Sequence, residues 1–254
     1  MTRTILITGG NRGLGLALVR CFVNAPSDEG AWNVVTTARR IESIPADVLE
    51  AQNVTVYPLD LQNSTSVDSL VQLLVGTTTA IPTTKLNVII HNAGFNPKDV
   101  KEGDFFESTF YAKCFSARSV AECCYINALH PMELTGKLLA GNCLAEDCMV
   151  LGISSWLGSI TNKNFAGHYG YAGSKALFNL CLKGLSLEFQ KDPDSNRCAI
   201  AINPGWMATD MGGPNAERTP DQVAQEIHKM IHDEGFLLRH NGCFLNIDRS
   251  EHPW

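Results

Sequence analysis

The feature that most constrains the fold of this chain is a glycine-rich turn near the start of the sequence. Residues 3–8 are mostly β-branched or apolar, and the turn Thr8-Gly9-x-x-x-Gly13-x-Gly15 follows at once. An apolar helical pattern then runs through Leu14, Leu18 and Phe22. A strand, a glycine-rich turn and a helix in this order place a phosphate against the helix amino terminus. Glycine permits the unusual backbone angles of such a turn and lets a diphosphate approach the backbone closely.

The spacing of these glycines narrows the choice of ligand. It differs from the G-x-G-x-x-G of many dehydrogenases, and it lacks the Gly-Lys-Ser/Thr ending of a P-loop. Hydrolysis of a nucleoside triphosphate is therefore disfavoured. A glycine-rich turn alone is also compatible with a plain strand-to-helix connection, but its position after the first strand favours dinucleotide binding.

Strand and helix patterns alternate along the whole chain. Further strands are expected at residues 32–38, 54–57, 85–90, 148–153, 198–202 and 242–245. Because no internal break or repeat interrupts this alternation, we predict one domain over residues 1–254. Its fold class is α/β, a Rossmann-type doubly wound parallel sheet of about seven strands with helices on both faces.

Three segments between the strands carry more specific expectations. The helix that ends near residue 140 contains Asn127, a weak helix former that tertiary contacts should hold in place. Residues 95–117 are irregular and rich in aromatic side chains, and such a loop could shape a substrate pocket or an oligomer contact. The glycine-rich span from Asn203 to about residue 217 is typical of a mobile lid.

The end of the second strand indicates which dinucleotide is bound. An Asp or Glu there would bind the ribose 2′-hydroxyl of NAD, whereas an arginine accepts the 2′-phosphate of NADP. This chain has Arg39-Arg40 and no acid at that point, and Arg12 lies within the glycine turn. Guanidinium groups suit bidentate phosphate recognition, although a pair of solvated surface arginines is the alternative. We predict NADP(H), with NAD(H) less favoured.

Tyr171 and Lys175 are four residues apart on a predicted helix and therefore share one face. A fixed ammonium beside a phenol favours phenolate, so the pKa of Tyr171 should fall from about 10 towards neutrality. Such a phenol could exchange a proton with a carbonyl or an alcohol. The alternative is an ordinary tyrosine and lysine on an amphipathic helix.

Bulk properties exclude some classes of partner and site. The net charge of −6 argues against a nucleic acid or an anionic membrane as the partner. The chain enters a strand without a signal peptide, and no apolar run approaches the roughly 18 residues of a membrane span, so a cytoplasmic location is expected. Nine cysteines without a C-x-x-C pair indicate reduced thiols and no metal site. His228 and His232 are expected on a solvated helix face.

Together these motifs resemble the short-chain dehydrogenase/reductase family over essentially the whole chain. The matching motifs are Thr8-Gly9-x-x-x-Gly13-x-Gly15, Asn92-Ala93-Gly94, Asn127, Ser155, Tyr171-x-x-x-Lys175 and Pro204-Gly205. The glycine spacing is similar to the single-domain branch. Residues 154–160, 204–213 and 242–254 are most similar to carbonyl reductases of the sniffer and C-factor type.

The resemblance implies four catalytic residues. Tyr171 is similar to the acid/base and Lys175 to the residue that lowers its pKa and holds the nicotinamide ribose. Ser155 matches the serine that hydrogen-bonds the reacting carbonyl, and Asn127 matches the residue that anchors a water in the proton relay. Ser155 is preferred to Ser154 because it completes the family's S-x-x-G spacing, but Ser154 stays open. Tyr169 is excluded because the residue four positions on is not a lysine.

The resemblance also implies a set of cofactor contacts. These are Gly9, Asn11, Arg12, Gly13, Leu14 and Gly15 at the phosphates, Arg39 at the 2′-phosphate, Asp60 and Leu61 at the adenine, Asn92, Ala93 and Gly94 after the fourth strand, Tyr171 and Lys175 at the ribose, and Pro204, Gly205, Met207 and Thr209 at the nicotinamide. One departure is His91, where the family usually has asparagine.

The function implied is reduction of a ketone, aldehyde or quinone-like carbonyl by hydride transfer from NADPH, with Tyr171 as proton donor. The alternatives are an NAD(P)-dependent alcohol dehydrogenase working in the oxidative direction and a non-catalytic dinucleotide sensor. The expected partner is a small carbonyl or alcohol, with no nucleic acid and no membrane. The resemblance further implies a homodimer or homotetramer.

Overall fold

Seven parallel strands form one sheet in this computed structural model, which describes residues 2–26, 30–76, 85–96, 116–192 and 195–254. The strands are β1 (Arg3–Ile7), β2 (Trp32–Ala38), β3 (Val54–Pro58), β4 (Leu86–His91), β5 (Leu144–Ile153), β6 (Cys198–Asn203) and β7 (Phe244–Asn246). Their order across the sheet is β3-β2-β1-β4-β5-β6-β7, with every neighbouring pair parallel. The predicted parallel sheet is confirmed.

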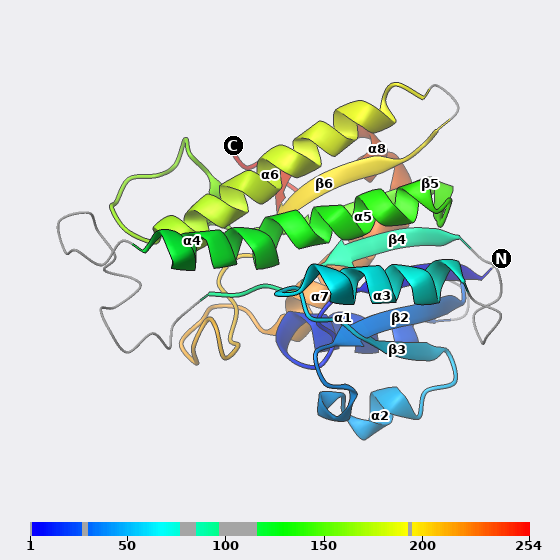
Figure 1. Cartoon of the computed structure of the whole chain (residues 1–254). Coiled ribbons are helices and arrows are strands. Elements are labelled where there is room, and N and C mark those ends of the chain that lie inside the picture. Colours follow the sequence, from blue (N-terminus) through cyan, green and yellow to red (C-terminus); the bar gives the residue numbers. More distant parts are fainter. Residues whose placement is uncertain (1, 27–29, 77–84, 97–115, 193–194) are drawn as a thin grey trace.

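Helices cover both faces of this sheet (Figure 1). One face carries α1 (Gly13–Val23), α7 (Pro220–His232) and α8 (Glu234–Arg239). The other carries α3 (Ser64–Val75), α4 (Ala117–Cys124), α5 (His130–Ala140) and α6 (Tyr169–Phe189). The short α2 (Ala46–Leu49) and 3-10 turns at Ile41–Ser43 and Trp156–Gly158 lie in the connections. The doubly wound arrangement is therefore as predicted.

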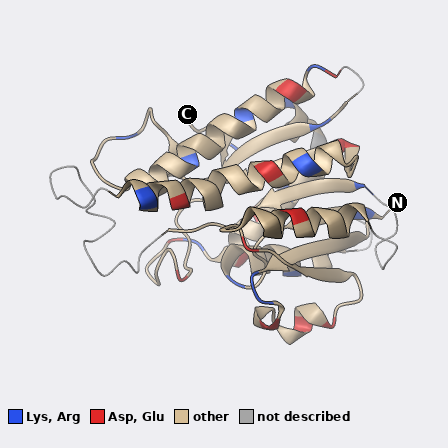
Figure 2. Cartoon of the chain, viewed as in Figure 1, with Lys and Arg blue, Asp and Glu red and all other residues tan. Residues whose placement is uncertain are grey.

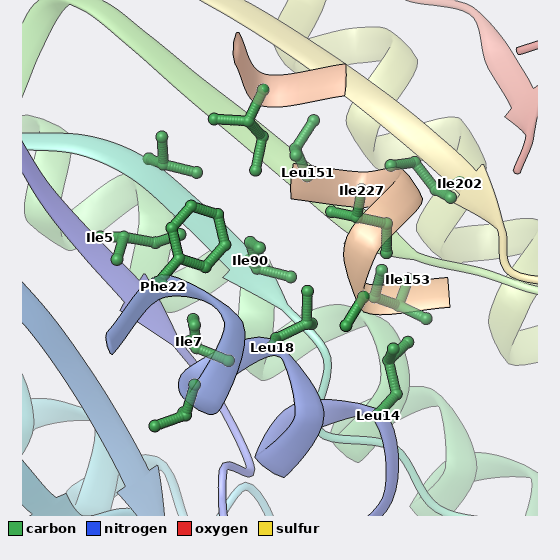
Figure 3. Close-up of a cluster of buried hydrophobic side chains, with 14 of the residues drawn as sticks. Ile5, Ile7, Leu14, Leu18, Phe22, Ile90, Leu151, Ile153, Ile202 and Ile227 are labelled. Carbon is green, nitrogen blue, oxygen red and sulfur yellow. The ribbon is translucent and has the colours of Figure 1, made fainter. Parts of the chain in front are cut away.

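The strands are buried on both faces because their side chains alternate between two hydrophobic cores. Ile5 and Ile7 of β1 point towards α1 and α7, where they join Leu18, Phe22 and Ile227 (Figure 3). The intervening residues contribute to the second core, beneath α3, α5 and α6. The near-continuous apolar runs in the sequence thus reflect a sheet covered on both sides.

Asn63 caps α3, because its side chain accepts from the Thr65 backbone N–H. The predicted solvated position of His228 is wrong: its ring is buried 4.9 Å from that of Phe22 and 4.2 Å from that of His232. Of the irregular 95–117 loop, residues 97–115 lie outside the described part of the chain.

The strand order positions the site. The chain moves outward from β1 to β3 and then crosses back to β4 on the other side of β1. At such a switch point the neighbouring loops diverge, and a crevice opens at the carboxyl ends of the strands. The turn after β1 and the loop after β4 border this crevice.

Helix α6 packs directly against β5 at Gly152, which has no side chain. A Cβ atom at this position would lie 2.4 Å from Leu182 Cδ1 and 2.6 Å from Phe178 Cε1, distances that real contacts do not show. Both neighbours are fully buried parts of the second core. Gly152 therefore sets the distance between the strand and the helix.

We predict that Gly152→Ala lowers the free energy of unfolding by about 1–3 kcal/mol, because the added methyl group overpacks this interface. Gly184→Ala is the matched control: it lies on α6, where an added Cβ meets no atom within 4 Å. This control should raise stability by about 0.5–1 kcal/mol through helix propensity. Urea denaturation of both variants tests the prediction, and equal stabilities would contradict it.

Candidate active site

A cavity of about 1280 Å³ lies at the carboxyl-terminal edge of the sheet. Most of the predicted site residues line it: Gly9, Asn11, Arg12, Gly13, Leu14, Arg39, Asp60, Leu61, Asn92, Ala93, Gly94, Ser155, Tyr171, Lys175, Pro204, Gly205, Met207 and Thr209. Two predicted residues, Gly15 and Asn127, are not part of this lining. The fold thus brings segments from the whole chain to one site.

The glycine turn has the shape expected of a phosphate cradle. Gly9 and Gly13 have φ angles of +74° and +54°, in the region that favours glycine. At Gly15 a Cβ atom would stand 2.0 Å from the Gly9 carbonyl oxygen, so Gly15 permits close packing within the turn. Asn92 Nδ2 donates to the carbonyl oxygens of Thr8 and Gly9, which fixes the turn against the loop after β4.

Arginines gather at the end of the cavity next to β2. Arg39 and Arg40 both line it, together with Ser43. Arg12 forms an ion pair with Asp210 at 2.8 Å, and both side chains are largely exposed. This ion pair joins the glycine turn to residues 204–212, the part of the predicted lid that lines the cavity. Elsewhere acidic and basic residues are interspersed along helices such as α5 and α6 (Figure 2).

Tyr171 enters the cavity from the first turn of α6 and hydrogen-bonds the side chain of Ser155. The Ser155 hydroxyl also accepts from the Leu157 backbone N–H at 3.2 Å. Ser154 is buried, and its hydroxyl donates to Asn179 Oδ1 at 2.6 Å. Ser155 thus lies against Tyr171, whereas Ser154, which also lines the cavity, is bonded to Asn179; Tyr169 lies outside the lining.

Lys175 is buried one helical turn beyond Tyr171, with 4% of its surface exposed. Its Nζ donates to the Ile153 carbonyl oxygen at 2.7 Å and lies 5.8 Å from the centre of the Tyr171 ring. Burial lowers the pKa of Lys175 to about 8 and raises that of Tyr171 to about 12. The expected fall in the Tyr171 pKa is therefore wrong for the chain by itself, because desolvation of the phenol outweighs the Ser155 hydrogen bond.

Asn127 connects α6 to the loop after β4. It is almost fully buried in a π-helical turn (Tyr125–Leu129) between α4 and α5. Its side chain accepts from Phe95 N at 2.7 Å and donates to Phe95 O at 2.8 Å and Ser174 Oγ at 2.9 Å. Ser174 Oγ in turn donates to the Tyr171 carbonyl oxygen at 2.7 Å. The prediction that tertiary contacts hold this asparagine is confirmed.

Sequence reasoning missed a group of large side chains in the lining: Trp156, Phe165, His168, Trp206 and Met211. They come from the connections after β5 and β6. For Trp156 and Trp206 the position close behind a strand end was the available signal, since ligands bind at that edge.

The described residues contain neither a cluster of metal-binding side chains nor a helix suited to crossing a bilayer. No group of three metal-binding side chains occurs among them. None of the described helices combines the length and the apolar character that a bilayer crossing needs.

Comparison with known proteins identifies the family. A family model described as short chain dehydrogenase matches residues 3–220. The chain is 29% identical to the C-signal protein of Myxococcus xanthus over 176 residues, which is 69% of this chain and 97% of that protein. It is 26% identical to "Carbonyl reductase [NADPH] 1" of Macaca fascicularis, with 88% of each chain covered. Among solved structures, the carbonyl reductase Sniffer of Drosophila melanogaster matches all of both chains with a TM-score of 0.82 and 28% identity.

The buried ammonium of Lys175 generates a prediction on stability. The folded pKa is about 8 and an unfolded lysine has a pKa of about 10.4, so between these values the unfolded chain binds more protons. The free energy of unfolding therefore increases as the pH rises from about 8 to about 10.4, and this gain is lost again as the pH falls back through 8. Relative to Lys175→Met, the wild-type chain should gain about 3 kcal/mol across this range.

Urea denaturation of both proteins from pH 7 to pH 10.5 measures this difference. Cysteine and tyrosine titration is common to both proteins and cancels in the subtraction. A wild-type minus variant difference that does not change with pH would refute the buried position of the ammonium.

Proposed function

The chain belongs to the short chain dehydrogenase family, and from this premise we propose that it reduces a carbonyl substrate with NADPH. The observation that carries the proposal is the convergence of Ser155, Tyr171 and Lys175 in the cavity that also contains the glycine turn. The family alone does not fix the reaction, because one fold hosts many activities. The residues at the site supply the argument.

The residues of the cavity fit a dinucleotide that carries a 2′-phosphate. The turn at Gly9 and Gly13 has the backbone form of a phosphate cradle, and the space beside Gly15 is closed by the Gly9 carbonyl. Arg39 and Arg40 would hold the 2′-phosphate, since neither an Asp nor a Glu follows β2 directly. The similar macaque protein is named for NADPH. When bound, this cofactor supplies the hydride, which is chemistry that the side chains themselves lack.

The side chains would handle the carbonyl oxygen and the proton. In this proposal the hydroxyls of Ser155 and Tyr171, already in contact, hold the oxygen as negative charge develops on it. The raised pKa keeps Tyr171 protonated at neutral pH, so its phenol is ready to donate a proton. Lys175 would bind the cofactor ribose beside it. Asn127 would act as a positioning residue through Phe95 and Ser174.

Two alternatives use the same cavity. Oxidation of an alcohol would require Tyr171 to accept a proton, and the raised pKa leaves almost no phenolate to accept one at neutral pH. A non-catalytic sensor would need the dinucleotide cavity but not the contact between Ser155 and Tyr171. Carbonyl reduction accounts for both the dinucleotide cavity and the contact between Ser155 and Tyr171.

We predict that Tyr171→Phe keeps NADPH binding within about twofold but lowers turnover by about 10²–10⁴-fold, because the proton donor is lost. A screen of aldehydes, ketones and quinones, followed by NADPH absorbance, measures turnover, and fluorescence titration measures binding. Tyr169→Phe is the matched control, because it removes a hydroxyl from the same helical turn outside the cavity lining. Full turnover by Tyr171→Phe would remove this residue from the mechanism.

The arginines generate a second prediction. Wild-type protein should bind NADPH at least about tenfold more tightly than NADH, and Arg39→Asp should abolish the difference, because a carboxylate repels the 2′-phosphate. Arg239→Asp on α8 introduces the same charge change outside the cavity lining and should leave the ratio unchanged. Tighter binding of NADH by the wild type would overturn the cofactor assignment.

A further inference from the structure

A row of rings extends from the proposed catalytic hydroxyls. Trp156 directly follows Ser155, and its ring centre lies 5.8 Å from that of Phe165. Phe165 in turn lies 5.6 Å from His168, edge to face. All three line the cavity, yet Trp156 remains 43% exposed. Large apolar side chains left open on a cavity wall are typical of a ligand contact.

Local contacts hold this row in place. Lys163 Nζ lies 4.0 Å from the centre of the Phe165 ring and donates to the Gly167 carbonyl oxygen at 2.9 Å. His168 has a φ of +56°, a left-handed conformation that is uncommon outside glycine and often found at functional sites. Its carbonyl accepts from Ala172 N, so the same residue begins α6. Burial and nearby Lys163 lower the pKa of His168, which keeps the imidazole neutral at neutral pH.

A second apolar pair, Trp206 and Met211, follows β6. Trp206 Nε1 donates to the Gly212 carbonyl oxygen at 2.7 Å, so the indole N–H is already used and the ring faces stay apolar. Asn203 Oδ1 accepts from both Trp156 N, at 3.1 Å, and Gly205 N, at 3.2 Å. One asparagine thereby holds the two ring-bearing segments next to each other.

Charged side chains are distributed unevenly along the cavity. Arg39 and Arg40 follow β2, on the other side of β1 from β5 and β6, whose connections carry the rings. Nearer the rings, Arg12 and Asp210 neutralise each other. The arginines thus give the described lining a cationic end suited to phosphates, while the other end, apart from the buried Lys175 and from Lys163 behind Phe165, presents ring surfaces suited to an apolar group.

We propose that Trp156, Phe165, His168, Trp206 and Met211 form an aromatic subsite, which selects carbonyl substrates bearing a planar, uncharged aromatic group. The ring spacings match those at which aromatic groups attract one another edge to face or with an offset. A saturated ring of similar size lacks the flat faces that these contacts need. The inference rests on the proposed function, because it names the substrate class of the same site.

The test compares benzaldehyde with cyclohexanecarbaldehyde as substrates for the wild type and for Phe165→Leu. This substitution removes the ring but keeps an apolar side chain. It should lower kcat/KM about tenfold for benzaldehyde and less than about threefold for cyclohexanecarbaldehyde, corresponding to the loss of one aromatic pair. Ile160→Ala is the matched control, because Ile160 lies in the same connection, 78% exposed and outside the cavity lining. NADPH affinity should stay unchanged in both variants.

A binding measurement separates this inference from the proposed function. Calorimetry with NADP⁺ present compares benzamide with cyclohexanecarboxamide, which are unreactive analogues. The subsite is supported if the wild type prefers benzamide and Phe165→Leu loses this preference. If the wild type turns over neither aldehyde, that result contradicts the reductase proposal but not the subsite. Equal loss of activity on both aldehydes, or equal binding of both amides, overturns the aromatic subsite.

Discussion

The close packing of α6 against β5 is the constraint on which the rest of the site depends. Gly152 allows α6 to pack closely against β5. Gly158, beyond the end of the strand, allows the same close packing, because an added Cβ there would lie 3.0 Å from Lys175 Cβ. At that separation Lys175 Nζ can reach the Ile153 carbonyl, and Tyr171 can reach Ser155. An added Cβ at Gly152 would force Leu182 and Phe178 of α6 to shift, and one at Gly158 would require Lys175 to move by a few tenths of an ångström. The chemistry thus depends on two positions that carry no functional group.

The packing of α6 against β5 also determines the pKa values of Tyr171 and Lys175. Burial disfavours the charged form of both residues, so it moves the two pKa values in opposite senses, with Lys175 lowered and Tyr171 raised. Proximity of an ammonium and a phenol in sequence therefore does not by itself lower the pKa of the phenol. The balance depends on how much water each group loses and on what the ammonium contacts, here a backbone carbonyl.

The sequence predicted the sheet and most of the cavity lining because strand ends and glycine spacing are local patterns with a fixed place in a parallel sheet. It did not predict features that arise from packing between distant segments. The π-helical turn around Asn127, the burial of His228 against Phe22 and the ring contacts of Phe165 are of this kind. Asn63 and Ser64 are both good capping residues by type, and only the geometry shows that Asn63 caps α3.

The ion pair between Arg12 and Asp210 has a consequence for how ligands enter. It spans the cavity from the glycine turn to residues 204–212, so the carboxylate of Asp210 already occupies a guanidinium that a phosphate would seek. An incoming dinucleotide phosphate would compete with this internal counter-ion for Arg12, and loss of the pair would remove one of the contacts between the turn and residues 204–212. Salt would weaken both the ion pair between Arg12 and Asp210 and a pair between Arg12 and the phosphate. Occupancy of one end of the cavity would in this way be coupled to the freedom of the segment that carries Trp206 and Met211.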